Sequence, residues 1–181
     1  MYDYNAFNYS QGNWPPMYDP YNYGPYNPYM NYNYSFNWPN QMPTRPMEPN
    51  RYIQLKDYGP APLVINIEDA TKQNSYYRTA LWTGKYFQLT LMSINVGEDI
   101  GLEMHPDVDQ FIRIEEGQGL AVMGDTKDNL NFQRRVSDDY IIIIPAGKWH
   151  NVINNGTKPL KLYSIYAPPE HPHGTVHRTR P

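Results

Sequence analysis

The sequence contains no cysteine, which excludes both a disulfide framework and thiolate chemistry. It also has no long apolar stretch. Its longest wholly apolar run, residues 141–146, is far shorter than the roughly 20 residues that a membrane-spanning helix needs. The N-terminus shows neither the basic nor the apolar segment of a secretory signal. Because the formal net charge is only -3, nothing favours nucleic acid or an anionic membrane as a partner. We therefore expect an intracellular, cytoplasmic protein that binds neither.

The first fifty residues lack leucine, isoleucine and valine altogether and consist mainly of tyrosine, asparagine and proline. Repeated prolines disfavour both a helix and a central strand. Without branched aliphatic side chains, the segment has no core to offset the entropy lost on ordering. We predict that residues 1–50 form a disordered low-complexity tail. It is either a solvated appendage or an element through which copies of the chain self-assemble or are cross-linked by tyrosine.

From residue 51 onward, short runs of β-branched and aromatic residues alternate with turns rich in Gly, Asn, Asp and Pro. This pattern predicts an antiparallel, all-β sandwich or barrel, and no βα alternation indicates a doubly wound sheet. A helical turn is expected at 70–73, capped by Asp69. The run 140–144 is apolar on both faces, which predicts a strand buried in a double sheet. We expect strands at 51–57, 76–82, 86–96, 102–105, 110–114, 120–123, 134–136, 140–144, 149–153 and 160–166.

Four side chains in this half of the chain are candidates for one interior site: Glu103, His105, Gln110 and His150. Glu103 and His105 are two residues apart, so in an extended segment both leave the same face. Gln110 begins the next expected strand, and His150 comes from another hairpin. Closure of a barrel would bring the four together. One carboxylate and two imidazoles suit a divalent transition metal, namely iron, manganese, nickel or zinc.

The two stretches that carry these residues resemble the two signature motifs of the cupin superfamily. The first motif, G-x5-H-x-H-x3,4-E-x6-G, keeps its frame here at Gly97, position 103, His105, position 110 and Gly117. The second, P-x-G-x2-H-x3-N, is matched at every fixed position by Pro145, Gly147, His150 and Asn154. Two positions depart from the pattern: Glu103 stands where a histidine is expected, and Gln110 where a glutamate is expected.

The resemblance implies that residues 51–181 form a single cupin domain, a double-stranded β-helix or jelly-roll barrel. It also implies a divalent metal held by the four candidate residues, and a homodimer. Gln110 either adds a carbonyl oxygen to the metal or hydrogen-bonds a ligand or water, and Asp109 is an alternative at that motif position. Glu103 either replaces the missing imidazole or acts as an acid/base in a metal-free pocket.

Within the superfamily the chain looks closest to the small mannose-6-phosphate-isomerase-like cupins of bacteria. We therefore expect a metal-dependent isomerase or dioxygenase acting on a small oxygenated substrate, with its catalytic residues unassigned. Alternatives are a module that binds a small carboxylate or sugar, and a non-catalytic structural protein, because the tail resembles those of bacterial spore-coat proteins. No phosphate-binding cluster is evident, since Lys148 and Arg113 read as solvated charges. The C-terminal histidines lie outside the predicted site: His171, His173 and His177.

Overall fold

The structure of the chain is a computed structural model that describes residues 52–181. The predictions for residues 1–50 fall outside the described residues. The described part runs as follows: α1 (Ile67–Gln73), β1 (Arg78–Thr83), β2 (Gln88–Ile94), β3 (Asp109–Glu116), β4 (Gln118–Gly124), β5 (Phe132–Ser137), β6 (Ile141–Ile144), β7 (Trp149–Ile153), β8 (Leu160–Ala167) and β9 (Val176–His177). In this part of the chain, no helix has the length and apolar character needed to cross a membrane.

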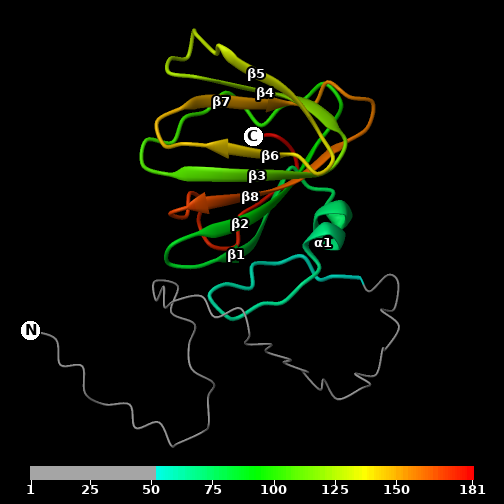
Figure 1. Cartoon of the computed structure of the whole chain (residues 1–181). Helices are drawn as coiled ribbons and strands as arrows, with labels where there is room; N and C mark the ends of the chain where they lie inside the picture. The colour runs from blue at the N-terminus through cyan, green and yellow to red at the C-terminus, as the bar shows by residue number, and fades with distance from the viewer. Residues whose placement is uncertain (1–51) are drawn as a thin grey trace, which may run out of the picture. The chain divides into compact units, whose positions relative to one another are not determined.

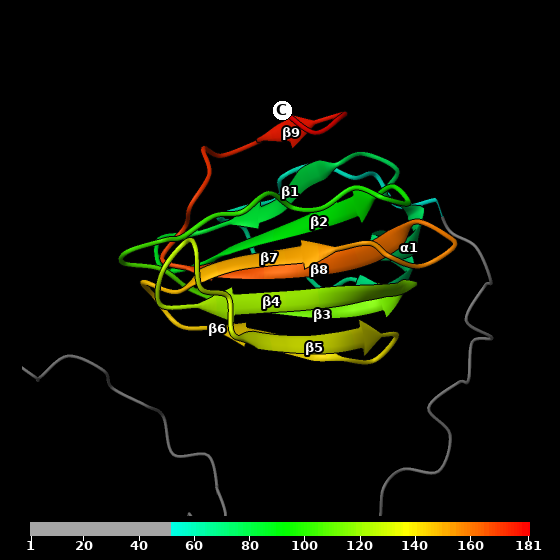
Figure 2. The same ribbon diagram turned by 90° about the horizontal axis from the view of Figure 1, so that it is seen from above.

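The strands form two sheets that face each other (Figure 1). The larger sheet has the order β6-β3-β8-β2-β1-β9, and the smaller sheet has the order β5-β4-β7. Viewed from above, β7, β4 and β5 overlie β8, β3 and β6 (Figure 2). All of the paired strands run antiparallel. The predicted all-β architecture is confirmed, with one short helix added.

The chain before β1 differs from its prediction. Residues 52–57 form no strand. Ile53 and Leu55 instead pack with the buried side chains of Leu81 and Leu91, so their alternation reflects packing rather than pairing in a sheet. The helix begins before the predicted turn, and its cap is Asn66, whose side chain accepts a hydrogen bond from the backbone of Asp69.

Strand β6 also departs from its prediction. Ile142 and Ile144 are buried, but Ile141 and Ile143 are each 55% exposed. The expectation of burial on both faces was wrong because β6 is the edge strand of the larger sheet and pairs with β3 alone. An apolar run of four residues cannot distinguish this position from a strand covered on both sides.

The inner face of the larger sheet has an apolar end and a polar end. One row of neighbouring side chains is apolar: Ile114, Leu162 and Met92. A second row, four residues further along the strands, is polar: Gln110, Tyr166 and Gln88. Both rows are buried. Because buried polar groups need partners, the polar end of the barrel is where a ligand site is expected.

Candidate metal centre

Glu103 and His105 lie in the connection between β2 and β3, and His150 lies in β7. Two glycines with left-handed backbones shape this connection, Gly97 at φ 82° and Gly101 at φ 92°. Further along, the segment pairs with β7. The Glu103 N–H donates to the His150 carbonyl at 3.1 Å, and the His150 N–H donates to the Glu103 carbonyl at 2.9 Å. The expected strand at 102–105 is therefore reduced to a single bridge, and that bridge sets the two site segments side by side.

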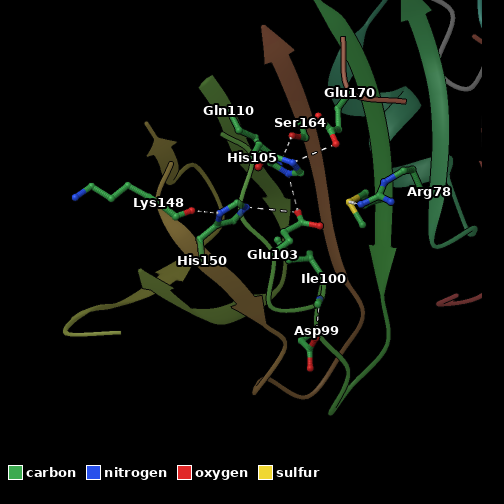
Figure 3. Close-up of polar contacts among 12 residues, drawn as sticks. Arg78, Asp99, Ile100, Glu103, His105, Gln110, Lys148, His150, Ser164 and Glu170 are labelled. Atoms are coloured by element: carbon green, nitrogen blue, oxygen red, sulfur yellow. Dashed lines mark hydrogen bonds and ion pairs between the residues drawn. The ribbon is translucent and has the colours of Figure 1, made fainter. Parts of the chain in front are cut away.

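Three ligand-type atoms converge at the polar end of the barrel (Figure 3). Glu103 Oε1 lies 3.5 Å from His105 Nε2 and 3.5 Å from His150 Nε2. The three atoms lie within 4.8 Å of one another. All three are buried, and none meets the geometry of a hydrogen bond within the described residues. The three atoms therefore face one another without forming hydrogen bonds to one another.

This arrangement fits a divalent metal ion. Ligand atoms about 2.1 Å from one ion lie roughly 3.0–3.4 Å apart when their bonds to it make angles of about 90–110°. The two separations of 3.5 Å are close to that range. Two neutral imidazoles and a carboxylate also suit iron, manganese, nickel or zinc. The structure therefore brings together three of the four predicted ligands: Glu103, His105 and His150.

The charges in the site reinforce this reading. Burial disfavours the ionised form of Glu103, but the imidazoles of His105 and His150 outweigh that effect and lower the pKa of Glu103 to about 2. The Glu103 carboxylate in turn raises the pKa of His105, which burial opposes and Glu170 reinforces. Glu103 is therefore an ionised and weakly basic group at neutral pH. On His105, a proton competes directly with a metal ion.

Each imidazole has a second contact that leaves its Nε2 directed at the site. His105 Nδ1 lies 3.2 Å from Glu170 Oε1, and His150 Nδ1 lies 2.9 Å from the Lys148 carbonyl oxygen. When the Nδ1 atoms carry the protons, both Nε2 atoms present lone pairs to one point. Such outer contacts orient metal-binding histidines and make them more basic. Glu170 was missed in the sequence because it comes from the segment after β8, far from either motif.

Gln110 lies in β3, where its amide nitrogen donates to Ser164 Oγ at 2.9 Å. Its Oε1 is buried without a hydrogen-bond partner among the described residues, so that oxygen is able to accept a bond from a ligand or contact a metal. Its role as a fourth metal ligand stays a prediction. The alternative residue, Asp109, is exposed, and its carboxylate accepts a hydrogen bond from the Ala146 N–H at 2.9 Å. Asp109 thereby ties the start of β3 to the connection between β6 and β7.

Tyr166 and Arg78, which the sequence did not single out, lie beside the site. His171, which the sequence placed outside the predicted site, lies next to Tyr166. Tyr166 of β8 is fully buried, with its ring edge-on to His105 at 5.8 Å and to His171 at 5.0 Å between centroids. Arg78 of β1 points toward the same interior (Figure 3). Burial, helped by the Arg78 charge, lowers the pKa of His171 to about 4. By contrast, His173 is exposed and contacts the Gly59 carbonyl at 3.0 Å.

Three surface hollows of about 420, 270 and 500 Å³ lie elsewhere in the described part of the chain, and none of the three is lined by Glu103, His105 or His150. Solvent reaches the site past Glu103 and Glu170, whose side chains are 25% and 32% exposed.

Comparison with known proteins places the matching segment over this site. The family model described as "Cupin domain" matches residues 90–166. The Bacillus subtilis protein YrkC is 68% identical over 131 residues, which is 72% of this chain and 70% of that protein. Protein L612 of Acanthamoeba polyphaga mimivirus is 44% identical over 119 residues, which is 65% of this chain and 72% of its own length.

A solved structure shows the same architecture. The crystal structure of BH2720 from Bacillus halodurans superposes with a TM-score of 0.69 at 67% sequence identity. The match covers 69% of this chain and 95% of that one. Sequence and backbone therefore agree on the family over the part of the chain that carries the site.

Proposed function

The chain belongs to the cupin-domain family, and on this premise we propose that it is a metal-dependent enzyme acting on a small oxygenated substrate, as an isomerase or a dioxygenase. Its metal ion is divalent and is held by Glu103, His105 and His150. One observation carries the proposal. Three buried ligand atoms converge without hydrogen-bond partners, and buried polar atoms left unsatisfied are costly unless something binds them.

The side chains at the metal site have different roles in the proposed reaction. A bound metal ion supplies a Lewis acid that polarises a substrate oxygen or activates dioxygen. With a pKa of about 2, Glu103 is a poor general base near neutral pH, which favours its role as a ligand over acid/base catalysis in a metal-free pocket. Glu170 orients the His105 ring, and the Gln110 carbonyl oxygen is available to a ligand.

The two cations that the sequence offered for phosphate are engaged with carboxylates. Lys148 pairs with Asp125. Arg113 lies 2.9 Å from Glu115 and 2.7 Å from Asp139. Neither Lys148 nor Arg113 therefore supports binding of a phosphate at the metal site.

The test begins with elemental analysis of the full chain purified without added metal. We expect close to one transition-metal ion per chain in the wild type, and loss of that metal in a His150→Ala variant. His173→Ala is the matched control, because His173 is 58% exposed and lies outside the three-residue site, so its metal content should stay at the wild-type level. A positive result justifies a substrate screen for isomerisation and for oxygen consumption.

The opposite result is equally clear. If the wild type is purified without metal and also fails to take up iron, manganese, nickel or zinc on dialysis, the metalloenzyme proposal is wrong. Equal metal content in His150→Ala and the wild type would place the metal elsewhere on the chain.

A further inference from the structure

Arg78 is a buried cation without an acidic partner in the described residues. It begins β1 and is 5% exposed. None of the ion pairs among residues 52–181 includes it. Its Nη2 contacts the Met92 sulfur at 3.9 Å, a weak acceptor, and its Cζ lies 5.5 Å from the Tyr77 ring centroid. Its Nε has no hydrogen-bond partner among the described residues. A guanidinium keeps its charge inside a protein, and no ion pair in residues 52–181 engages that charge directly.

Two hydroxyls on the same side of the sheet are also unsatisfied. Tyr166 Oη and Thr90 Oγ1 are fully buried, and neither has a hydrogen-bond partner in the described residues. Thr90 pairs across the strands with Ser164, two residues before Tyr166. A phenol hydroxyl and a threonine hydroxyl can each donate one hydrogen bond. Arg78, Tyr166 and Thr90 together present N–H and O–H groups to one interior.

The charges beside these donors favour an anion. With a divalent metal bound, the ion and Arg78 would carry three positive charges, against the two negative charges of Glu103 and Glu170. One positive charge would then be left over. A buried charge without a partner is unfavourable, and a carboxylate is the partner whose two oxygens match the planar fork of arginine.

We propose that Arg78 binds the carboxylate of a small organic acid whose second oxygen reaches the metal held by Glu103, His105 and His150. The proposal rests on the metal site of the proposed function and assigns its substrate class. Tyr166 and Thr90 donate hydrogen bonds to the same ligand.

The experiment compares acids with their uncharged amides in zinc-loaded full-length protein by isothermal titration calorimetry. The probes are glycolate against glycolamide and malonate against malonamide, which differ in charge but little in shape. In the wild type we expect at least one acid to bind tenfold more tightly than its amide. In Arg78→Met this preference should fall below twofold while the zinc content stays unchanged.

The control is Arg134→Met. Arg134 lies in β5 with its Cζ 4.8 Å from the Phe132 ring centroid, so it has a similar aromatic contact but is exposed on the surface. It should keep the wild-type preference. If Arg78→Met does not fold, Arg78→Lys replaces it. That variant keeps the charge but loses the two-pronged geometry, and we expect its preference for the acid to fall at least threefold.

Two results would overturn the proposal: no acid binds more tightly than its amide in the wild type, or the folded Arg78 variant keeps the full preference. Failure of the metal site gives a different pattern. The wild type would then hold no zinc, and the same titrations of the metal-free protein would still show whether the preference for acids depends on Arg78.

Discussion

Replacing Glu103 with glutamine removes the negative charge at the centre of the site while keeping the size of the side chain. In the metal-free protein the pKa of this carboxyl is lowered from 4.5 to about 2, and its side chain is only 25% exposed. Lowering this pKa from 4.5 to about 2, at about 1.4 kcal/mol per pKa unit, corresponds to roughly 3.5 kcal/mol of folding free energy. We expect Glu103→Gln to lose up to about that amount of stability.

The pH dependence follows from the signs of two shifts. Because the pKa of Glu103 is lowered on folding, its stabilisation is present above pH 4.5 and is lost as the pH falls toward 2. Because the pKa of His105 is raised from 6.5, its stabilisation is present below pH 6.5 and is lost as the pH rises through the raised folded value. Both Glu103 and His105 are therefore charged in the folded protein between pH 4.5 and pH 6.5. The difference between the wild type and Glu103→Gln should therefore be largest near pH 5.5 and smaller at pH 3 and above pH 8.

The assay is urea unfolding in the presence of a chelator, followed by far-UV circular dichroism at pH 3, 5.5 and 8, with free energies from linear extrapolation. Urea is uncharged, so it does not screen the interactions under test. Glu98→Gln is the matched control, because Glu98 lies in the same connection and contacts the Asn95 side chain at 3.1 Å rather than an imidazole. A difference between the wild type and Glu103→Gln that is the same at all three pH values would refute the reasoning.

Two further changes probe the support of the site and of the barrel. Glu170→Gln removes the charge that faces His105 Nδ1 at 3.2 Å. We expect this variant to bind zinc about tenfold more weakly in a competition titration with a chromophoric chelator. An unchanged affinity for zinc would show that Glu170 does not orient the His105 ring. In Gly124→Ala a new Cβ would meet the Asn129 carbonyl oxygen at 1.8 Å, so the hairpin must shift and thermal unfolding should report a loss of about 3 kcal/mol or more. Gly97→Ala, whose Cβ meets nothing within 4 Å but whose φ is 82°, should lose only about 1–2 kcal/mol, and equal losses in the two variants would contradict the steric argument.

The motif spacing predicted which residues meet, because it records local geometry. Residues two apart in an extended segment share a face, so the sequence alone predicted that the side chains of Glu103 and His105 lie on the same side. His150 was predicted to join them through a resemblance, and the bridge between Glu103 and His150 gives the physical reason. The placement of Gln110 in β3 was also anticipated, although its bond to Ser164 was not.

Other parts of the site depend on contacts between distant segments. Glu170 reaches His105 across 65 positions of the chain, and nothing in its own surroundings marks it as a partner of a histidine. Arg78 sits at the start of an otherwise ordinary strand between β2 and β9, and nothing in its own segment marks it as a buried residue. The exposed side chains of Ile141 and Ile143 show the reverse case, in which an apolar run is left at a sheet edge.

The sequence by itself determined the all-β class, most of the strands, and a site built from one carboxylate and two imidazoles. These features follow from short-range periodicity, turn residues and motif spacing, which a linear chain displays directly. Only the tertiary structure decided that the barrel interior has an apolar and a polar end, that Glu170 contacts His105, and that Arg78 faces the same interior without an acidic partner in residues 52–181. The reason is that strand order and register determine which distant side chains share a face, and neither can be read directly from a single sequence.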